Sequence, residues 1–462
     1  MDRWLKAALD YIPDWIDFQM RVFQRPGCTV AMTHRGRVVF EGAWGFADVA
    51  RKQLMTPRHR FRVASHSKSF TAAGIMKLRE QRALRLDDPV GEHVDGLHKK
   101  IAEATIQQVL SHGAGITRDG GDPVFWLEAK RFPDAAALQR TLTPTIPAAT
   151  RLKYSNHGYG LLGLVIEAVT GERYADWMQR EVIAVAGLAE TDPDMRPALR
   201  GKLAKGYSAK ALLDRRVTIP AQMATNAIAP GVGFVSTAAD LARFYAQLAP
   251  QAKRSLLSAA SRREMVRRQW RDPYSSVESY YGLGLASGQV GDWTWVGHGG
   301  GFPGFVTRTA VLLDQEIAIS VLTNCGDGLA GPWLDGIVQI MRGFNRNGAP
   351  TRRTSGWTGR WWGAYGPCDL VPMANKVIAA NPFAFNPFLD CSELTPTGRD
   401  RARISQAGGF GNYGEEVVLK RGARDRIAEI SFAGWPLQTE AKAAKALTDR
   451  YEKPAKKKRR RR

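Results

Sequence analysis

Strand-forming segments near the start of the chain and near residue 320 constrain its fold most strongly. The first, CTVAMTHRGRVVFEGAWGFADV (28–49), consists of two β-rich stretches around a His-Arg-Gly turn, and so predicts a hairpin. Strand patterns return in DWTWVGH (292–298), FVTRTAVLLD (305–314) and EIAISVLTN (316–324). Strands at both ends with helices between them predict an α+β fold. We expect one antiparallel sheet whose edge strands come from the two termini, flanked by helices and interrupted by an all-helical insertion.

Helical periodicity occupies much of the intervening sequence. Apolar residues recur at helical spacing from Ser65 to about Arg82, and again in GLLGLVIEAVTG (160–171) and DLARFYAQLA (240–249). The leading segment, 1–20, carries acids and a proline among its apolar residues, which favours an amphipathic helix over a secretory signal. No apolar run is long enough to predict a membrane span, and a cytoplasmic location is expected.

The character of the sequence changes near NRNGAPTRRTSG (345–356). Short strand-like pieces separated by turns follow, among them EEVVLKR and IAEISFAGW, and they predict a small all-β barrel or sandwich. The expected organisation is a first domain over 1–345, a linker over 346–356, a small β-barrel over 357–436 and a basic, disordered tail over 437–462.

The chain is strongly basic, with a formal net charge of +22 at pH 7. Its last seven residues, Lys456–Arg462, are all lysine or arginine. Such an end favours non-specific contact with anionic surfaces. Neither aromatic interleaving nor a recognisable nucleic-acid-binding fold accompanies it, so we do not expect a specific nucleic-acid ligand.

The sequence gives little support to metal, disulfide or nucleotide chemistry. The four cysteines form no CxxC pair and are expected to be reduced, the last two being the pair to consider if any were bridged: Cys28, Cys325, Cys368 and Cys391. His93 and His98 lack further histidines nearby and are expected at the surface rather than as zinc ligands. Neither GxSxG nor GxxxxGK[ST] is present, so neither an α/β-hydrolase nor a nucleotide hydrolase is predicted, and no cofactor is expected.

The segment VASHSKSF (63–70) contains the strongest candidate for a nucleophile. Ser65 and Lys68 are three residues apart and can touch on one helical face, whereas Ser67 and Lys68 diverge. Burial and nearby groups could free the lysine amine to take the serine proton. An N-cap serine beside a solvated lysine is the alternative, and it is the commoner meaning of an isolated SxxK.

Two further motifs could complete such a site. Tyr154 and Asn156 in KYSNHGYG precede a glycine-punctuated helix, where the phenol could lie next to the lysine amine and the two would depress each other's pKa. His298 begins HGGG, whose glycines Gly300 and Gly301 let a substrate approach the backbone closely. Taken singly, the tyrosine is better interpreted as a half-buried residue that caps a core, and a glycine-rich loop with an incidental histidine is a common alternative for the third motif.

Together, SxxK, YxN and HxG in this order resemble the serine β-lactamase and penicillin-binding-protein superfamily. The segments LRLDDPV, VLSHGAGI, GVGFVSTAADLARF and YGLGL match it in order as well, so that the resemblance covers about residues 20–345. It implies the following roles: Ser65 as acylated nucleophile, Lys68 as base, Tyr154 as proton relay, Asn156 as the residue that holds lysine and substrate, His298 and Gly300 on the substrate-binding strand, and the Ser65 and Gly301 amides as oxyanion hole. The region after 356 is similar to the lipocalin-like domains of some of these hydrolases.

Histidine at 298 departs from the lysine that often fills this position. Because histidine is mostly neutral near pH 7, it binds a carboxylate less surely than lysine does. The resemblance is therefore closer to esterases, D-aminopeptidases and D-amino-acid amidases, which implies a small ester, amide or D-amino-acid substrate and no metal. A penicillin-binding D-Ala carboxypeptidase or weak β-lactamase is the alternative, and an inactive binding protein of the same fold is a third hypothesis. Loops 117–132 and 271–281 are expected to select the substrate.

Overall fold

A computed structural model describes residues 1–128, 130–408 and 412–452 of the chain. Its contacts divide it into two compact units. One unit is Phe23–Leu334. The other combines Met1–Val22 with Asp335–Arg462. The predicted borders at 345 and 356 stay a prediction; these contacts group the first 22 residues with the C-terminal region.

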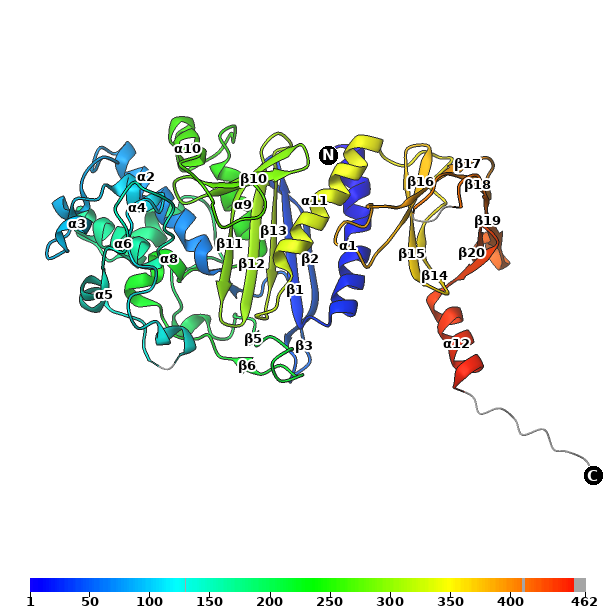
Figure 1. The fold of residues 1–462 in the computed structure, drawn as a ribbon, viewed down its shortest axis with the longest axis horizontal. Coiled ribbons are helices and arrows are strands. Elements are labelled where there is room, and N and C mark those ends of the chain that lie inside the picture. The colour runs from blue at the N-terminus through cyan, green and yellow to red at the C-terminus, as the bar shows by residue number, and fades with distance from the viewer. Residues whose placement is uncertain (129, 409–411, 453–462) are drawn as a thin grey trace, which may run out of the picture. The chain divides into compact units, whose positions relative to one another are not determined.

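The Phe23–Leu334 unit is built around a nine-stranded sheet in the order β3-β2-β1-β13-β12-β11-β10-β9-β8 (Figure 1). The strands are β1 (Gly27–His34), β2 (Arg37–Asp48), β3 (Gln53–Leu54), β8 (Trp270–Arg271), β9 (Ser279–Tyr281), β10 (Ala286–Val290), β11 (Trp293–Phe302), β12 (Phe305–Leu312) and β13 (Ile317–Thr323). Neighbouring strands pair antiparallel, as predicted.

The order of the strands corrects one expectation. The first and last long strands, β1 and β13, pair with each other inside the sheet, from Cys28↔Thr323 to His34↔Ile317, instead of forming its two edges. Both strands are buried along their whole length. Strands with two apolar faces need neighbours on both sides, whereas the edge positions go to the two-residue strands β3 and β8.

The predicted hairpin is confirmed in β1 and β2. Arg35 and Gly36 connect the strands with φ values of 52° and 75°, which suits a two-residue turn of the kind that favours glycine. A second tight connection, Pro303-Gly304, joins β11 to β12 and has Gly304 at φ 85°. It fixes the register that aligns Gly300 with Thr307.

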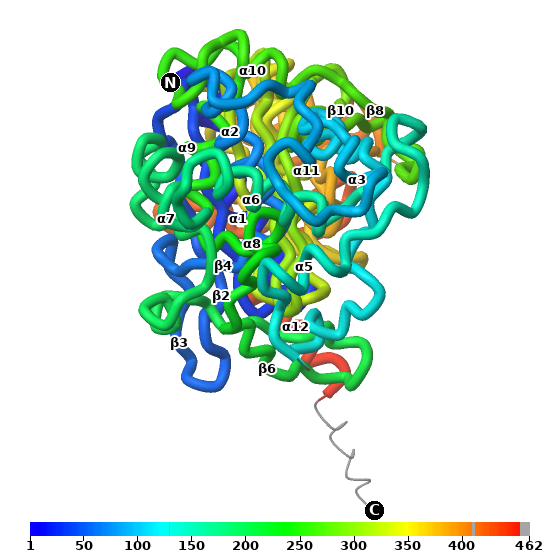
Figure 2. The backbone as a smooth tube through the Cα atoms, turned by 90° about the vertical axis from the view of Figure 1, so that its left-hand side faces the viewer, coloured from blue at the N-terminus to red at the C-terminus, as the bar shows by residue number. Residues whose placement is uncertain are grey.

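Helices cover this sheet and form the insertion between β3 and β8 (Figure 2). Those that position the site are α2 (Ser67–Glu80), α4 (Ile106–Leu110), α6 (Asn156–Thr170), α8 (Ala229–Val232) and α9 (Ala238–Leu248); the others are α3 (Lys99–Ala102), α5 (Ala135–Thr141), α7 (Tyr174–Met178) and α10 (Ala259–Val266). The helices predicted over 160–171 and 240–249 correspond to α6 and α9. The insertion is not wholly helical, because it includes the short strand pairs β4 (Phe61–Arg62) with β7 (Val235–Ser236) and β5 (Gly206–Tyr207) with β6 (Thr218–Ile219).

The helices α6 and α8 pack closely against each other. A side chain at Gly163 would clash with the Pro230 ring, and one at Gly231 would lie 3.0 Å from the Asn156 carbonyl oxygen. The two helices therefore approach almost backbone to backbone, in the centre of the view in Figure 2. This contact brings the Gly231 carbonyl next to Asn156.

The second unit contains α1 (Arg3–Phe23), most of α11 (Ala330–Asn347) and a closed eight-stranded barrel. The barrel strands are β14 (Gly359–Gly363), β15 (Gly366–Met373), β16 (Lys376–Ala380), β17 (Ser392–Pro396), β18 (Arg401–Gln406), β19 (Glu416–Arg421), β20 (Ile427–Phe432) and β21 (Trp435–Gln438). The barrel confirms the prediction of a small all-β domain. Within the described residues, no helix is long and apolar enough to cross a membrane.

The predicted disorder of 437–462 is wrong for its first part. Residues Glu440–Tyr451 form α12, although none of its side chains is buried. Its sequence is rich in alanine, and Lys445 pairs with Asp449 one turn later, so intrinsic propensity and a local ion pair favour a helix. The basic run Lys456–Arg462 lies outside the described residues.

Candidate active site

The chain turns sharply at Ser65, between β4 and α2. Ala64 has a φ of 48°, and residues Ala64–His66 form a single 3₁₀ turn. The α-helix itself begins at Ser67, two residues later than predicted. From 61 to 76 every residue except Ser65 is buried. The turn thus exposes one hydroxyl in an otherwise buried segment.

The neighbours of Ser65 in the motif serve as anchors. Ser67 donates to the Ala64 carbonyl (2.6 Å) and accepts from the Phe234 amide (3.0 Å), and Ser69 donates to the Gly284 carbonyl (2.6 Å). His66 bonds the Val63 carbonyl through Nδ1 (2.8 Å) and the Thr309 hydroxyl through Nε2 (3.0 Å). Burial lowers the pKa of His66 to about 3, so the ring is neutral. These three side chains are fully occupied in holding the turn.

Lys68 is completely buried and has three neutral acceptors. Its Nζ lies 2.7 Å from Asn156 Oδ1, 2.8 Å from the Gly231 carbonyl oxygen and 3.2 Å from Ser65 Oγ. Burial lowers the pKa of Lys68 well below its usual value, and the Asp119 charge opposes that shift. A lowered pKa makes the deprotonated amine, the form that can act as a base, easier to reach.

The hydrogen-bond partners fix the direction of the lysine lone pair. The Asn156 and Gly231 oxygens can only accept, so they take the two N–H groups of a neutral amine. The lone pair is then left for the Ser65 hydroxyl. Tyr154 supplies the complementary bond, because its phenol donates to Ser65 Oγ at 2.7 Å. Ser65 Oγ thus accepts a hydrogen bond from Tyr154, and its own hydroxyl hydrogen is free to be donated to a deprotonated Lys68.

Aromatic rings surround this pair. The Lys68 amine lies 4.6 Å from the centre of the Tyr154 ring, and the His112 ring packs against the same tyrosine with its centre 4.2 Å away. Burial raises the pKa of Tyr154, and its bond to Ser65 only partly offsets this. The expectation that Tyr154 and Lys68 depress each other's pKa is thus wrong for the tyrosine. The phenol therefore keeps its proton, with which it donates the hydrogen bond to Ser65.

Two residues of the loop 117–132 belong to the same cluster, although no motif singled them out. Asn156 Nδ2 donates to Asp119 Oδ1 at 2.7 Å, and the Arg118 guanidinium pairs with Asp119 at 3.1 Å. Asp119 is 13% exposed, whereas the Arg118 side chain is 65% exposed. The only sequence signal was their position in a polar loop, because no fixed spacing relates Asp119 to the SxxK or YxN motif.

His298 lies at the predicted place on β11 and is neutral. Its Nε2 is 3.0 Å from the Tyr281 hydroxyl, and its Nδ1 donates to the Gly299 carbonyl at 2.6 Å. Burial lowers the pKa of His298 well below its usual value, with the neighbouring Lys68 and His66 adding to the effect. His298 therefore offers no fixed positive charge to a substrate carboxylate. Tyr281, which serves to orient it, is the last residue of β9, so the predicted loop 271–281 is partly strand, with β8 at its start and β9 at its end.

The glycines of β11 differ in what surrounds them. A side chain at Gly300 would clash with the Val63 carbonyl and lie 2.5 Å from Thr307 Oγ1, whereas one at Gly301 would meet nothing within 4 Å. Gly300 thus allows the strand to pack directly against the turn that carries Ser65. Gly301 faces open space at the point where the resemblance puts the oxyanion donor.

The structure assigns other roles to the remaining candidates. All four cysteines are free thiols, as predicted, including Cys368 and Cys391. His98 caps α3 by accepting from the Lys100 amide, and His93 lies 3.5 Å from Asp88. Across residues 1–128, 130–408 and 412–452, no group of three or more potential metal ligands is found.

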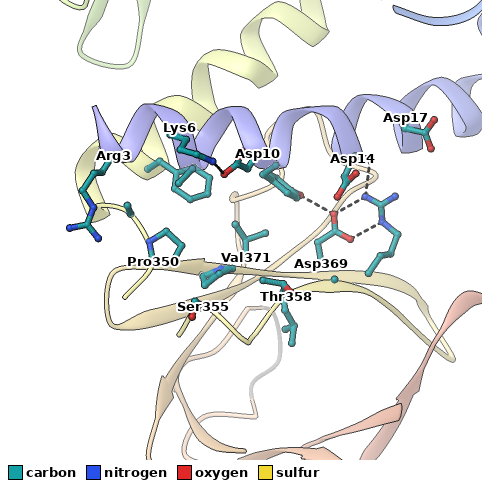
Figure 3. Close-up of a pocket in the computed structure, with 18 residues that line it drawn as sticks. Arg3, Lys6, Asp10, Asp14, Asp17, Pro350, Ser355, Thr358, Asp369 and Val371 are labelled. Atoms are coloured by element: carbon teal, nitrogen blue, oxygen red, sulfur yellow. Dashed lines mark hydrogen bonds and ion pairs between the residues drawn. The ribbon is translucent and has the colours of Figure 1, made fainter. Parts of the chain in front are cut away.

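The second unit has a cavity of its own, of about 500 Å³ (Figure 3). It lies between α1, the segment 349–359 and strands β14 and β15. Arg360 holds Asp369 through two bonds of 2.7 and 2.8 Å, and the Tyr11 phenol donates to the same carboxylate at 3.0 Å. Its one lining lysine, Lys6, pairs with Asp10 at 2.7 Å, so the cavity lacks a serine–lysine pair like that at Ser65.

A family model decides the affiliation of the chain. The model described as Beta-lactamase matches residues 14–335, which include Ser65, Tyr154 and His298. This chain belongs to the beta-lactamase family. The fold and family place it in the β-lactamase/transpeptidase-like superfamily of serine hydrolases.

Individual relatives are more distant. "Protein flp" of Staphylococcus aureus strain MW2 is 29% identical over 161 residues, which are 33% of this chain and only 32% of that protein. The chain thus matches about a third of the length of this relative. Among solved structures, the octameric penicillin-binding protein homologue from Pyrococcus abyssi covers 93% of this chain and 99% of its own (TM-score 0.64, 21% identity). The D-amino acid amidase from Ochrobactrum anthropi SV3, complexed with D-phenylalanine, covers 73% and 99% (TM-score 0.63, 22% identity). At these identities, the structural likeness establishes the fold.

Proposed function

We propose that this chain hydrolyses esters or amides of small carboxylic acids through an acyl-enzyme on Ser65. The observation that carries the proposal is the hydrogen-bond pattern around Ser65 Oγ. Tyr154 donates to this oxygen at 2.7 Å, and the Lys68 amine lies 3.2 Å from it. Once deprotonated, this amine can take the serine proton. A serine beside a positioned base is the recurring arrangement of acyl-transfer enzymes.

In the first step, Lys68 takes the Ser65 proton while Oγ forms a bond to the substrate carbonyl carbon. The negative charge that develops on the carbonyl oxygen is stabilised by the backbone amides of Ser65 and Gly301, each donor being worth roughly 10²–10³-fold in rate in comparable sites. Tyr154 then protonates the leaving alcohol or amine, and the bond to it breaks. The proton held by Lys68 restores the phenol.

The second step reverses these roles. Water enters in place of the leaving group and loses a proton to the Lys68–Tyr154 pair as it attacks the acyl carbon. Ser65 Oγ leaves and regains a proton, and the carboxylic acid is released. Every proton transfer uses groups within the cluster, so the proposed reaction needs no metal ion or cofactor.

The neutral state of His298 favours substrates without a carboxylate near the scissile bond over β-lactams. Penicillins and D-Ala-D-Ala peptides carry a carboxylate near the scissile bond, and a neutral imidazole that already bonds Tyr281 offers it little attraction. We therefore propose small esters, or amides of D-amino acids of the kind that names one structural neighbour, as the substrate class. A D-Ala carboxypeptidase or weak β-lactamase is the second candidate, favoured only by the shared family.

Labelling of the nucleophile tests the proposal. Wild-type chain and Ser65→Ala are incubated with a fluorophosphonate probe and a panel of p-nitrophenyl esters and D- and L-amino-acid amides. We expect one adduct on Ser65, and loss of both labelling and turnover in Ser65→Ala. Ser67→Ala is the matched control, since Ser67 only anchors the turn, and it should still label at Ser65. Turnover that persists in Ser65→Ala, or labelling of another serine, would contradict the assignment.

The alternatives give different results in the same assays. A long-lived adduct with a fluorescent penicillin, together with release of D-Ala from a model peptide, would favour the carboxypeptidase. A folded wild-type chain that neither labels nor turns over any substrate would favour an inactive binding protein.

A further inference from the structure

Asn156 is held between the Lys68 amine and the Asp119 carboxylate, and its amide can bond both in only one orientation. Oδ1 accepts from the Lys68 amine at 2.7 Å, while Nδ2 donates to Asp119 Oδ1 at 2.7 Å. A carboxylate has no hydrogen to give, so it can face only the NH₂ end of the amide. Asp119 therefore determines which end of Asn156 faces Lys68.

This orientation matters for the base. With Oδ1 toward the lysine, one N–H of Lys68 is taken up by Asn156 and a second by the Gly231 carbonyl. With the amide reversed, Nδ2 would present a hydrogen to Lys68 and compete with Ser65 for the amine lone pair. The reactive geometry at Ser65 thus depends on a carboxylate that does not touch the nucleophile.

We propose that Asp119 is a positioning residue, which fixes the Asn156 amide and, through it, the lone pair of Lys68, while Arg118 balances the Asp119 charge. The inference rests on the proposed function of Ser65 and deepens it. It adds two residues from the loop 117–132 that no motif of the family singled out. Their chain of contacts runs Arg118 to Asp119 (3.1 Å), Asp119 to Asn156 (2.7 Å) and Asn156 to Lys68 (2.7 Å).

The two residues have opposite electrostatic effects on the buried amine. The titratable or charged groups around Lys68 come from four parts of the chain. They are His112, Arg118 and Asp119 in the segment 111–119, Tyr154 before α6 and Tyr159 within it, Tyr281 on β9 and His298 on β11. Burial keeps both histidines neutral and raises the pKa of each tyrosine, so the arginine and the aspartate carry the fixed charges. Asp119 raises the pKa of Lys68 and Arg118 lowers it.

Three variants separate position from charge. Asp119→Asn removes the charge but keeps an oxygen that can accept from Asn156. Asp119→Ala removes both, and frees the amide to reverse. Arg118→Ala leaves the Asp119 charge without its partner. For each full-length variant, the rate of labelling by a fluorophosphonate probe is measured from pH 5 to 10, together with kcat and KM for p-nitrophenyl acetate.

We expect opposite shifts of the acidic limb of the rate profile. Loss of the charge in Asp119→Asn should move this limb to lower pH by about half a unit or more, and Arg118→Ala should move it to higher pH. Asp119→Ala should lower the labelling rate and kcat by roughly 10–100-fold, as expected when a supporting contact of a catalytic group is lost. Asp119→Asn should recover most of that rate. Equal limbs in all variants, or equal losses in Asp119→Asn and Asp119→Ala, would overturn the proposal.

A direct titration keeps the inference separate from the proposed function. The ε-carbon of Lys68 is followed by NMR in ¹³C-lysine-labelled protein and assigned with Lys68→Arg. A lower Lys68 pKa in Asp119→Asn and a higher one in Arg118→Ala are expected whether or not the chain is an enzyme. If the wild type does not label, the proposed function fails. If it labels but the Lys68 pKa is the same in every variant, only this inference fails.

Discussion

Two basic side chains, the part-buried Arg360 of the barrel unit and the buried Lys68 of the sheet unit, are accommodated in opposite ways. Arg360 in the barrel unit forms two hydrogen bonds with the buried carboxylate of Asp369. Lys68 in the sheet unit, which is 0% exposed, touches three neutral oxygens and no carboxylate. Burial acts to lower the pKa of Arg360, but the bonded Asp369 outweighs it, so that this pKa is raised. For Lys68, burial dominates and the pKa is lowered.

The difference indicates what each region is for. In the cavity of Figure 3, Asp369 is paired with Arg360 and also accepts a hydrogen bond from Tyr11 of α1, so the pair stabilises the contact of α1 with the barrel. A guanidinium paired in this way stays protonated and does not act as a base. An amine without a carboxylate partner is less favourable to bury, but burial lowers its pKa and so favours the deprotonated form that can act as a base. Stability and reactivity are thus assigned to different units of the chain, and four measurements test this division.

The largest effect is expected from removing the base. Lys68→Met should lower the fluorophosphonate labelling rate of Ser65 by about 10³-fold or more, because the members of one catalytic unit fail together. Lys77→Met is the control: this lysine lies on the same helix but pairs with Glu181 at 2.7 Å, and its loss should leave labelling unchanged. Labelling of Lys68→Met at a tenth of the wild-type rate would show that another group takes the proton.

In the barrel unit, breaking the pair should affect stability. Arg360→Met leaves Asp369 buried without its cation and should lower the free energy of unfolding by about 3 kcal/mol, measured by urea denaturation. The double variant Arg360→Met/Asp369→Leu should recover most of this loss, because no charge remains buried. Ester turnover per folded molecule should be unchanged in both. A double variant as unstable as the single one would mean that Asp369 is not the cause.

The sequence predicted the positions of Ser65 and Lys68, but neither the burial of Lys68 nor the contact of Asp119 with Asn156. The SxxK spacing identified Ser65 and Lys68 because an i, i+3 relation is a local property of the chain. The burial that lowers the pKa of Lys68 is not local, since it comes from α6 and α8 packing against its helix and from β11 packing against the turn that precedes the helix. Asp119 could not be found for the same reason: 37 residues separate it from Asn156, and no periodicity relates them.

The fold shows the same limit. Strand positions and the barrel followed from local patterns, but the pairing of β1 with β13 did not, because pairing depends on which strands need two neighbours. The run IAISVLT, apolar at almost every position, was a signal of an interior strand. Conversely, the charge of the C-terminal region suggested disorder, while its alanine content supports α12.

A third test asks how closely the reactive region must be packed. Gly300→Ala would force β11 away from the Val63 carbonyl and so shift the oxyanion strand relative to Ser65. A displacement of this kind should lower kcat/KM for p-nitrophenyl esters by up to about 10²-fold. Gly301→Ala, whose side chain would meet nothing within 4 Å, should cost far less. Equal losses in the two variants would point to backbone flexibility rather than close packing as the cause.

The smallest effect is the pH dependence that an unpaired buried lysine imposes on stability. In the unfolded chain, Lys68 titrates near its ordinary pKa of about 10.4, while in the folded chain its pKa lies well below that. Between the two values the unfolded state binds more protons, so the free energy of unfolding rises with pH and levels off above about 10.4. Relative to Lys68→Met, the wild type should gain about 1 kcal/mol between pH 8 and pH 9, measured by urea denaturation at each pH. Arg360→Met should show no comparable slope relative to the wild type, since an arginine keeps its charge throughout this range. A difference between wild type and Lys68→Met that is independent of pH would mean that Lys68 keeps its charge in the folded chain, as Arg360 does, and that the two basic side chains are accommodated alike.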